Sequence, residues 1–309
     1  RGADFNVQNE YGNTPLYNSC CTGHIEVVRQ LLDKGADINR SNTFKWAPMN
    51  MASDQGLLDI VRLLIERGAD INVQDEFGRT PLSCACYRGH VEVVKTLVLS
   101  GADLETANQD GFTPLNVASE RGFLDIVTIL VNKGVSLGSG APDGWTSLHL
   151  ASWDGYVDIV TLLLEKGAAI DSAKSDGWTS LHVASWDGYV DIVTLLLEKG
   201  AAIDSAKSDG WTSLHVASER GYVDIVTLLL EKGAAIDSAT PDGWTPLHLA
   251  SWDGSVDIVT LLLEKGAAID SATSDGWTSL HVASGKGYVD IVTLLLEKGA
   301  GIDSATPDG

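Results

Sequence analysis

The segment TSLHVASWDGYVDIVTLLLEKG, residues 179–200, decides the fold of this chain. Thr179 is of a residue type that caps helix N-termini, and Gly188 can adopt the left-handed conformation that ends a helix. Within residues 190–197, valine and leucine recur at spacings of three and four, which places them on one face of a second helix. The segment therefore predicts two short helices, the first ended by Gly188 and the second by Gly200.

A turn follows the helix pair. Residues 201–210 end in Asp-Gly, a residue pair typical of a tight hairpin. We expect each unit to be a helix pair with a projecting hairpin, which we call the finger. Neither helix can bury its apolar face alone, so the unit needs neighbours in order to fold.

The same pattern recurs along almost the whole chain with a period of about 33 residues. A Thr-Pro/Ser-Leu core marks the copies, at Thr14, Thr80, Thr113, Thr146, Thr179, Thr212, Thr245 and Thr278. Residues 47–49, Ala-Pro-Met, fill the second place in this register, and residues 245–250 carry the motif T-P-L-H-x-A in full. The period and the motif resemble those of the ankyrin repeat family.

This resemblance implies an all-α solenoid, an ankyrin repeat stack of helix-turn-helix units with β-hairpin fingers. It also implies a non-catalytic protein–protein interaction module that binds a protein or peptide along its concave groove. Near-identical tandem copies are similar, moreover, to the repeat sensor domains of fungal NOD-like receptors, which would make the chain the ligand-sensing domain of a larger receptor. The alternative is a structural scaffold or spacer array without a specific groove ligand.

The copies fall into two groups. Residues 1–139 hold four divergent copies and an N-terminal partial one, and residues 140–309 hold five near-identical copies and a C-terminal partial one. We expect both groups to form one continuous solenoid. Neither end has an obvious polar capping repeat, so the termini are candidates for end-to-end self-stacking.

The second copy departs most from the pattern. Lys45 replaces the turn glycine and Ala47 replaces the capping threonine. Loss of the cap alone costs about 1 kcal/mol, so local softness is expected here.

The charge is strongly acidic and uneven. The net charge is −21, of which residues 1–139 contribute −5 and the remainder −16. Such a surface repels phosphate groups, which argues against nucleic acid and membrane partners and favours a protein or peptide of cationic character.

The four cysteines, Cys20, Cys21, Cys84 and Cys86, lie on expected helices at a spacing typical of a core. We interpret them as small buried hydrophobic residues. Because nothing in their spacing indicates disulfides, we expect a reducing, cytoplasmic or other intracellular compartment.

The near-identical copies differ from one another mainly in the finger and at the exit of the first helix. All nine tryptophans fall in two positions, the one before the capping threonine and the helix exit. An aromatic strip with a charged rim is typical of an interface. The candidate partner-binding residues on the concave face are Trp145, Trp153, Asp154, Trp178, Trp186, Asp187, Trp211, Glu219, Arg220, Trp244, Trp252, Asp253, Trp277 and Lys286.

A purely structural explanation of these tryptophans remains open. Each ring would then pack on the next finger and stiffen the stack, with lysines such as Lys174 lying over the rings.

Sequence motifs for catalysis, metals and cofactors are not found. The histidine of the T-x-L-H motif recurs once per copy, for example at His182, and the family resemblance implies a structural hydrogen-bonding role near the hairpin. Neighbouring copies, about 10 Å apart, cannot bring these imidazoles to one metal. No phosphate-binding glycine motif or nucleophile–base–acid set occurs. We therefore expect no enzyme activity, no metal site and no cofactor.

Overall fold

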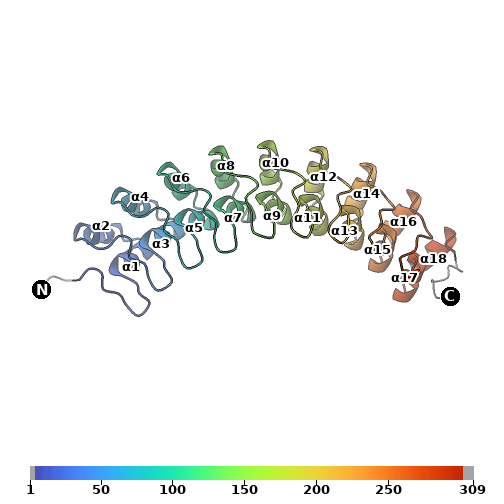
Figure 1. Cartoon of the computed structure of the whole chain (residues 1–309), viewed down its shortest axis with the longest axis horizontal. Helices are drawn as coiled ribbons and strands as arrows, with labels where there is room; N and C mark the ends of the chain where they lie inside the picture. The colour runs from blue at the N-terminus through green and yellow to red at the C-terminus, as the bar shows by residue number, and fades with distance from the viewer. Residues whose placement is uncertain (1–3, 302–309) are drawn as a thin grey trace. The chain divides into compact units, whose positions relative to one another are not determined.

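The computed structural model describes residues 4–301 and divides the chain into two compact units, residues 1–168 and residues 169–309. Helices follow one another in pairs in both units (Figure 1). The described helices of the first unit are α1 (Pro15–Cys21), α2 (Ile25–Asp33), α3 (Pro48–Asp54), α4 (Leu58–Glu66), α5 (Pro81–Arg88), α6 (Val91–Leu99), α7 (Pro114–Glu120), α8 (Leu124–Asn132), α9 (Ser147–Trp153) and α10 (Val157–Glu165). Those of the second are α11 (Ser180–Asp187), α12 (Val190–Glu198), α13 (Ser213–Glu219), α14 (Val223–Glu231), α15 (Pro246–Asp253), α16 (Val256–Glu264), α17 (Ser279–Lys286) and α18 (Val289–Glu297).

From α7 on, the first helix of each pair begins at a capping box. The Thr179 hydroxyl accepts the backbone N–H of His182 at 3.5 Å, and the imidazole Nδ1 accepts the Thr179 N–H at 3.3 Å. Both bonds satisfy donors that a helix start would otherwise leave unpaired. The helix ends at Gly188, whose φ of +83° is left-handed. The helix pair expected from the sequence is therefore confirmed.

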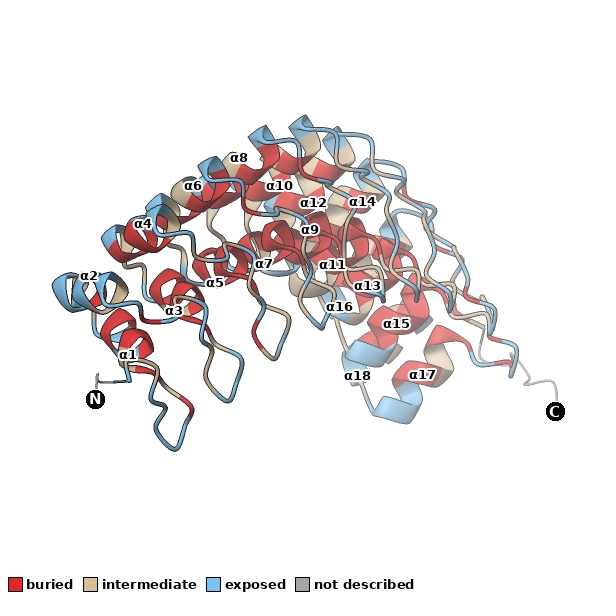
Figure 2. Cartoon of the chain, turned by 60° about the vertical axis from the view of Figure 1, so that its left-hand side comes forward, coloured by how far each residue is buried: buried red, intermediate tan, exposed pale blue. Residues whose placement is uncertain are grey.

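The core lies between the two helices of a pair and between neighbouring pairs. Leu181 on α11 and Ile192, Val193 and Leu196 on α12 are buried. Figure 2 shows the same pattern in other copies, where the odd-numbered helices are mostly buried and the even-numbered ones only along one face. Because the buried faces of adjacent copies meet, each copy completes the core of its neighbour.

Side chains also tie neighbouring copies together. The Asp204 carboxylate accepts the backbone N–H of Ala235 at 2.9 Å, and Asp237 accepts that of Ala268 at the same distance. Asn39 makes the equivalent bond in a divergent copy, 2.9 Å from the N–H of Asp70. In these copies the position therefore carries a hydrogen-bond acceptor for the next copy, whereas Gly138 at the equivalent place has no side chain to accept.

The glycine after the first helix makes room for an aromatic ring of the next copy. A Cβ atom on Gly188 would lie 2.9 Å from ring atoms of Tyr222, closer than such atoms approach. The left-handed backbone and the close ring both require glycine at this position.

The fingers are tight turns without regular strands. In the Lys174 finger, the lysine N–H donates to the Trp178 carbonyl at 2.8 Å, and the Gly177 N–H donates to the Lys174 carbonyl at 2.9 Å. Between residues 4 and 301, strand pairing is limited to one isolated bridge, Gly140 with Thr146. The expected hairpins are thus present as turns whose arms are too short to form a ladder.

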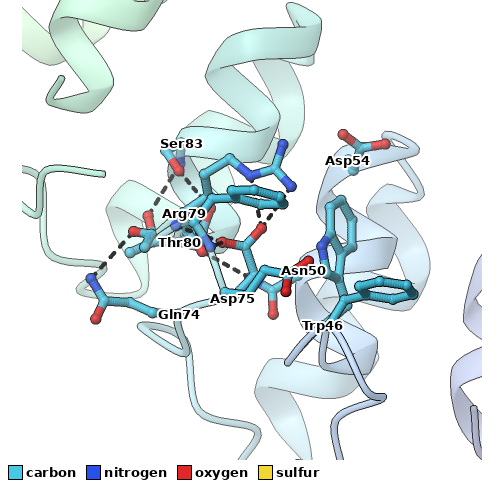
Figure 3. Close-up of polar contacts among 12 residues, drawn as sticks. Trp46, Asn50, Asp54, Gln74, Asp75, Arg79, Thr80 and Ser83 are labelled. Carbon is cyan, nitrogen blue, oxygen red and sulfur yellow. Dashed lines mark hydrogen bonds and ion pairs between the residues drawn. The ribbon is translucent and has the colours of Figure 1, made fainter. Parts of the chain in front are cut away.

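The second copy is strained where the sequence departs from the pattern. Lys45 has a φ of 58° and is the one non-glycine residue with positive φ in the described range. Ala47 provides no side-chain cap, and the Asn50 side chain takes over part of that role by accepting the Ala47 N–H at 3.1 Å. The Asn50 amide also donates to the Arg79 carbonyl at 3.3 Å, which joins this copy to the next (Figure 3).

One of the cysteine assignments is wrong. Cys20, Cys84 and Cys86 are buried, but Cys21 is exposed. Cys21 is the last residue of α1 and follows buried Cys20 directly, so its side chain points away from the core face.

Candidate functional site

Two positions in every copy lie on the same side of the helix pair. We call the position before the capping threonine the finger slot. We call the position seven residues after that threonine, which holds Trp153 in the fifth copy, the exit slot. From the second copy on, the finger slot holds Trp46, Arg79, Phe112, Trp145, Trp178, Trp211, Trp244 and Trp277. The exit slot holds Asp54, Tyr87, Glu120, Trp153, Trp186, Glu219, Trp252 and Gly285.

Where both slots hold tryptophan, the two rings form an edge-to-face pair. The ring centroids are 5.5 Å apart for Trp145 with Trp153 and 6.0 Å apart for Trp244 with Trp252. The third pair, Trp178 with Trp186, has a separation of 5.6 Å. This geometry suits the quadrupoles of the two rings and fixes the orientation of each.

None of these rings is sequestered in the core. The exposed fraction is 40% for Trp153, 48% for Trp252 and 47% for Trp277. Trp186 and the finger tryptophans from Trp46 to Trp244 are half-buried. The rings therefore remain accessible from solvent.

In copies five to eight, a buried histidine lies beneath the finger tryptophan of its own copy. The Trp178 and His182 ring centroids are 6.2 Å apart, and His182 Nε2 lies 3.1 Å from the Trp211 carbonyl of the next finger. Because Nδ1 accepts the Thr179 N–H, Nε2 carries the proton and donates to that carbonyl. This confirms the hydrogen bond from the motif histidine to the hairpin that the sequence resemblance implied.

The same histidine is held neutral by its surroundings. Burial lowers the pKa of His182 from 6.5 to about 4, and nearby Lys207 acts in the same direction. The bond to the Trp211 carbonyl and the charge of Asp209 act in the opposite direction without cancelling the effect of burial. The imidazole is therefore a structural group and a poor proton carrier at neutral pH.

Cations from the following copy cover two of the tryptophan rings of the exit slot. The Arg220 guanidinium lies 4.6 Å from the Trp186 ring centroid, and the Lys286 ammonium lies 3.3 Å from that of Trp252. Both cations follow the exit slot of their own copy directly. The contacts stabilise the rings by cation–π attraction.

A lysine in the finger makes a similar contact. The Lys207 ammonium lies 4.5 Å from the Trp178 ring centroid and 5.1 Å from that of Trp211, so it sits beside two successive finger tryptophans. It also forms an ion pair with Asp209 at 3.1 Å.

In a divergent copy, an arginine makes the equivalent cation–π contacts. Arg79 lies 5.0 Å from the Trp46 ring centroid and 4.9 Å from that of Phe77. A 2.7 Å ion pair with the buried carboxylate of Asp75 holds the guanidinium in place (Figure 3).

A hollow of about 590 Å³ lies in the first unit where fingers and exit slots meet. Its lining consists of Tyr87, Phe112, Glu120, Arg121, Trp145, Leu150, Trp153, Asp154 and Tyr156. Burial raises the pKa of Glu120, and the nearby charge of Asp154 raises it further. Arg121 opposes this shift and also lies 4.7 Å from the Tyr87 ring centroid.

A second hollow, of about 380 Å³, lies at the equivalent place in the second unit. It is lined by Asp209, Trp211, Glu219, Thr240, Asp242, Trp244, Leu249 and Trp252. Three indole rings and three carboxylates therefore make up most of its lining.

The structure groups the predicted site residues unevenly. Trp145, Trp153 and Asp154 line the first hollow, and Trp211, Glu219, Trp244 and Trp252 line the second. The remaining candidates, Trp178, Trp186, Asp187, Arg220, Asp253, Trp277 and Lys286, line neither of these two hollows.

The sequence interpretation missed the part of the first hollow that comes from the divergent copies. Tyr87 and Glu120 occupy the exit slot in copies three and four, and Phe112 occupies the finger slot. The repeat register would have found them, because Glu120 and Tyr87 lie one and two periods before Trp153 and Phe112 lies one period before Trp145.

The described residues provide little reactive chemistry. Burial raises the pKa of the Cys20 and Cys84 thiols to about 12, so both stay protonated and unreactive at neutral pH. No group of three or more His, Cys, Asp or Glu side chains between residues 4 and 301 is placed to hold a metal ion. None of the helices described has the length and apolar character that a bilayer crossing requires.

The fold is a solenoid of stacked helix pairs, and in each unit the finger and exit slots present variable side chains. A family model for ankyrin repeats, built of three copies, matches the chain in overlapping segments: 1–75, 68–141, 99–174, 133–207, 170–240, 202–273 and 232–306. The chain therefore belongs to the ankyrin repeat family. No individual curated protein matches it. Ankyrin repeats are in general protein–protein interaction modules and are typically non-catalytic.

Proposed function

We propose that this chain binds a protein or peptide partner along the side formed by the finger and exit slots. The supporting observation is that a hollow rich in indoles and carboxylates occurs at the same place in each unit. Exposed tryptophan beside charged groups provides the large apolar contact and the polar rim that interface hot spots need.

A cationic partner fits this surface best. The near-identical copies carry most of the net charge of −21, and carboxylates line both hollows. Such a field attracts positively charged proteins and speeds their association at low ionic strength.

The experiment compares partner capture with stability in matched variants. Trp153→Ala and Trp252→Ala remove exposed rings, and Leu99→Ala and Val289→Ala remove exposed apolar side chains from second helices as controls. We expect the tryptophan variants to weaken partner binding about 30-fold each, which corresponds to a hot-spot loss of about 2 kcal/mol, with little change in melting temperature. The two controls should bind as the wild type does.

The spacer alternative predicts the opposite result. If the tryptophan variants lose stability but retain every partner that the wild type captures, the rings are structural and the binding proposal is wrong.

A further inference from the structure

The fingers of the second unit are of two kinds. Lys174 and Lys207 occupy the first position of their turns, whereas Thr240 and Thr273 occupy the same position in the next two fingers. This exchange changes both the hydrogen bonding of the turn and the surroundings of the tryptophans.

In the Lys207 finger, the aspartate is fully engaged. Asp209 accepts the Trp211 N–H at 3.2 Å and forms the 3.1 Å ion pair with Lys207. The same lysine ammonium lies within about 5 Å of two finger indoles, Trp178 and Trp211. A lysine side chain of the protein itself thus occupies the space beside this pair of rings.

In the Thr240 finger, the side chain of the equivalent aspartate, Asp242, does not take part in the turn. The Thr240 hydroxyl accepts the Trp244 N–H at 3.0 Å and so replaces the carboxylate in the turn. Within the described part of the chain, the Asp242 side chain makes no hydrogen bond or ion pair, and no lysine or arginine lies over the Trp244 ring.

This aspartate faces the 380 Å³ hollow. Trp211 and Trp244 line the hollow with Trp252, and Asp242 lines it with Glu219. Burial raises the pKa of Glu219, against the opposing charges of the nearby Arg220 and Lys207, and the charge of Asp253 raises it further. Lys286 covers Trp252 but is not part of the lining.

We propose that this hollow binds a lysine side chain of the partner, whose ammonium takes the place beside Trp211 and Trp244 that Lys207 takes one copy earlier. The proposal rests on the proposed function and specifies the ligand chemistry of one part of the surface. Asp242 and Glu219 neutralise the ammonium, the indoles contact it and the methylene chain, and no lysine or arginine of the described residues lies over the Trp244 ring.

The probe is a five-residue peptide, blocked at both ends, with one lysine between glycines. Matched peptides carry norleucine, which keeps the chain without the charge, or arginine. In an NMR titration, we expect the lysine peptide to shift the indole N–H signals of Trp211 and Trp244 and to bind at least about tenfold more tightly than the norleucine peptide. Equal affinity for lysine and norleucine, or tighter binding of arginine than of lysine, would overturn the proposal.

Two reciprocal variants locate the site. Thr240→Lys installs the residue found at Lys207 and should reduce affinity for the lysine peptide at least about tenfold, because the new ammonium fills the position. Lys207→Thr should open an equivalent position, so that the Trp178 indole signal, unaffected in the wild type, shifts on titration. Val289→Lys adds the same charge on an exposed part of α18 and should leave the affinity unchanged.

The variants distinguish failure of the lysine-position proposal from failure of the proposed function. Wild-type affinity in Thr240→Lys refutes the lysine position even where Trp252→Ala abolishes partner capture. Loss of lysine-peptide binding in Thr240→Lys, together with unchanged partner capture in Trp252→Ala, supports the lysine position and refutes the wider interface.

Discussion

Acid should destabilise this protein through its buried histidines, and His182 is the best place to measure the effect. The side chain is fully buried, accepts the Thr179 N–H and donates to the Trp211 carbonyl. Protonation at Nδ1 would turn that acceptor into a donor facing another donor and would place a charge in the core.

The sign and size of the effect follow from the lowered pKa. Since the folded pKa of His182 is about 4 and the unfolded value is 6.5, the folded state binds fewer protons. Stability from this group is therefore complete above pH 6.5 and is lost as the pH falls toward 4. At about pH 5 the expected loss is about 2 kcal/mol. Burial also lowers the pKa values of His215 and His248, so these copies lose stability in the same direction.

A natural substitute for the histidine supplies the control. Asn116 occupies this position in copy four, where its side-chain oxygen accepts the Thr113 N–H at 2.9 Å. His182→Asn should therefore keep the capping box but remove the titrating group. Urea unfolding at about pH 7.5 and about pH 5 should show a loss in wild type that exceeds the loss in His182→Asn by about 2 kcal/mol. Equal losses in the two proteins would refute the assignment of a neutral, buried imidazole to this position.

Three further predictions concern stability and are measured by thermal or urea unfolding. Gly188→Ala should destabilise by about 2 kcal/mol, because it strains a left-handed backbone and presses on Tyr222; a change below about 0.5 kcal/mol would contradict the close approach. Lys45→Gly should stabilise by about 1 kcal/mol by relieving the positive φ, whereas a neutral result would mean that the turn is not strained. Ala47→Thr should add about 1 kcal/mol by restoring the missing cap, and a loss of stability would show that the buried site cannot hold the hydroxyl.

The repeating architecture was predictable because each local signal agreed with the period. Thr179 as a cap, Gly188 as a terminator and the apolar spacing of α12 all recur in one common register along the chain. Such agreement between local and long-range patterns leaves one fold favoured. The strand content of the fingers was not predictable in the same way, because the Asp-Gly signal defines a turn and says nothing of how far its arms pair.

The candidate site was predictable in position but not in its contacts. Variation among near-identical copies located the finger and exit slots. It did not reveal that Arg220 covers Trp186, which depends on side-chain reach between copies, or that the Thr240 hydroxyl takes the place of the Asp242 carboxylate, which depends on side-chain geometry within the finger. Nor did it find Tyr87, whose type differs from the tryptophan of later copies although its position is the same.

The regular spacing of the bonds between copies has a consequence for how such a chain can change over generations. Asp204 bonds to a residue 31 positions ahead and His182 to one 29 positions ahead. Deleting or duplicating one whole repeat among the near-identical copies brings an identical donor to each acceptor, so the new junction is as well bonded as the old one. Recombination within the gene can therefore reorder the lysine-bearing and threonine-bearing fingers without any new mutation in the core. The order of positions that the protein's own lysine occupies, and of positions left for a partner's lysine, changes with it.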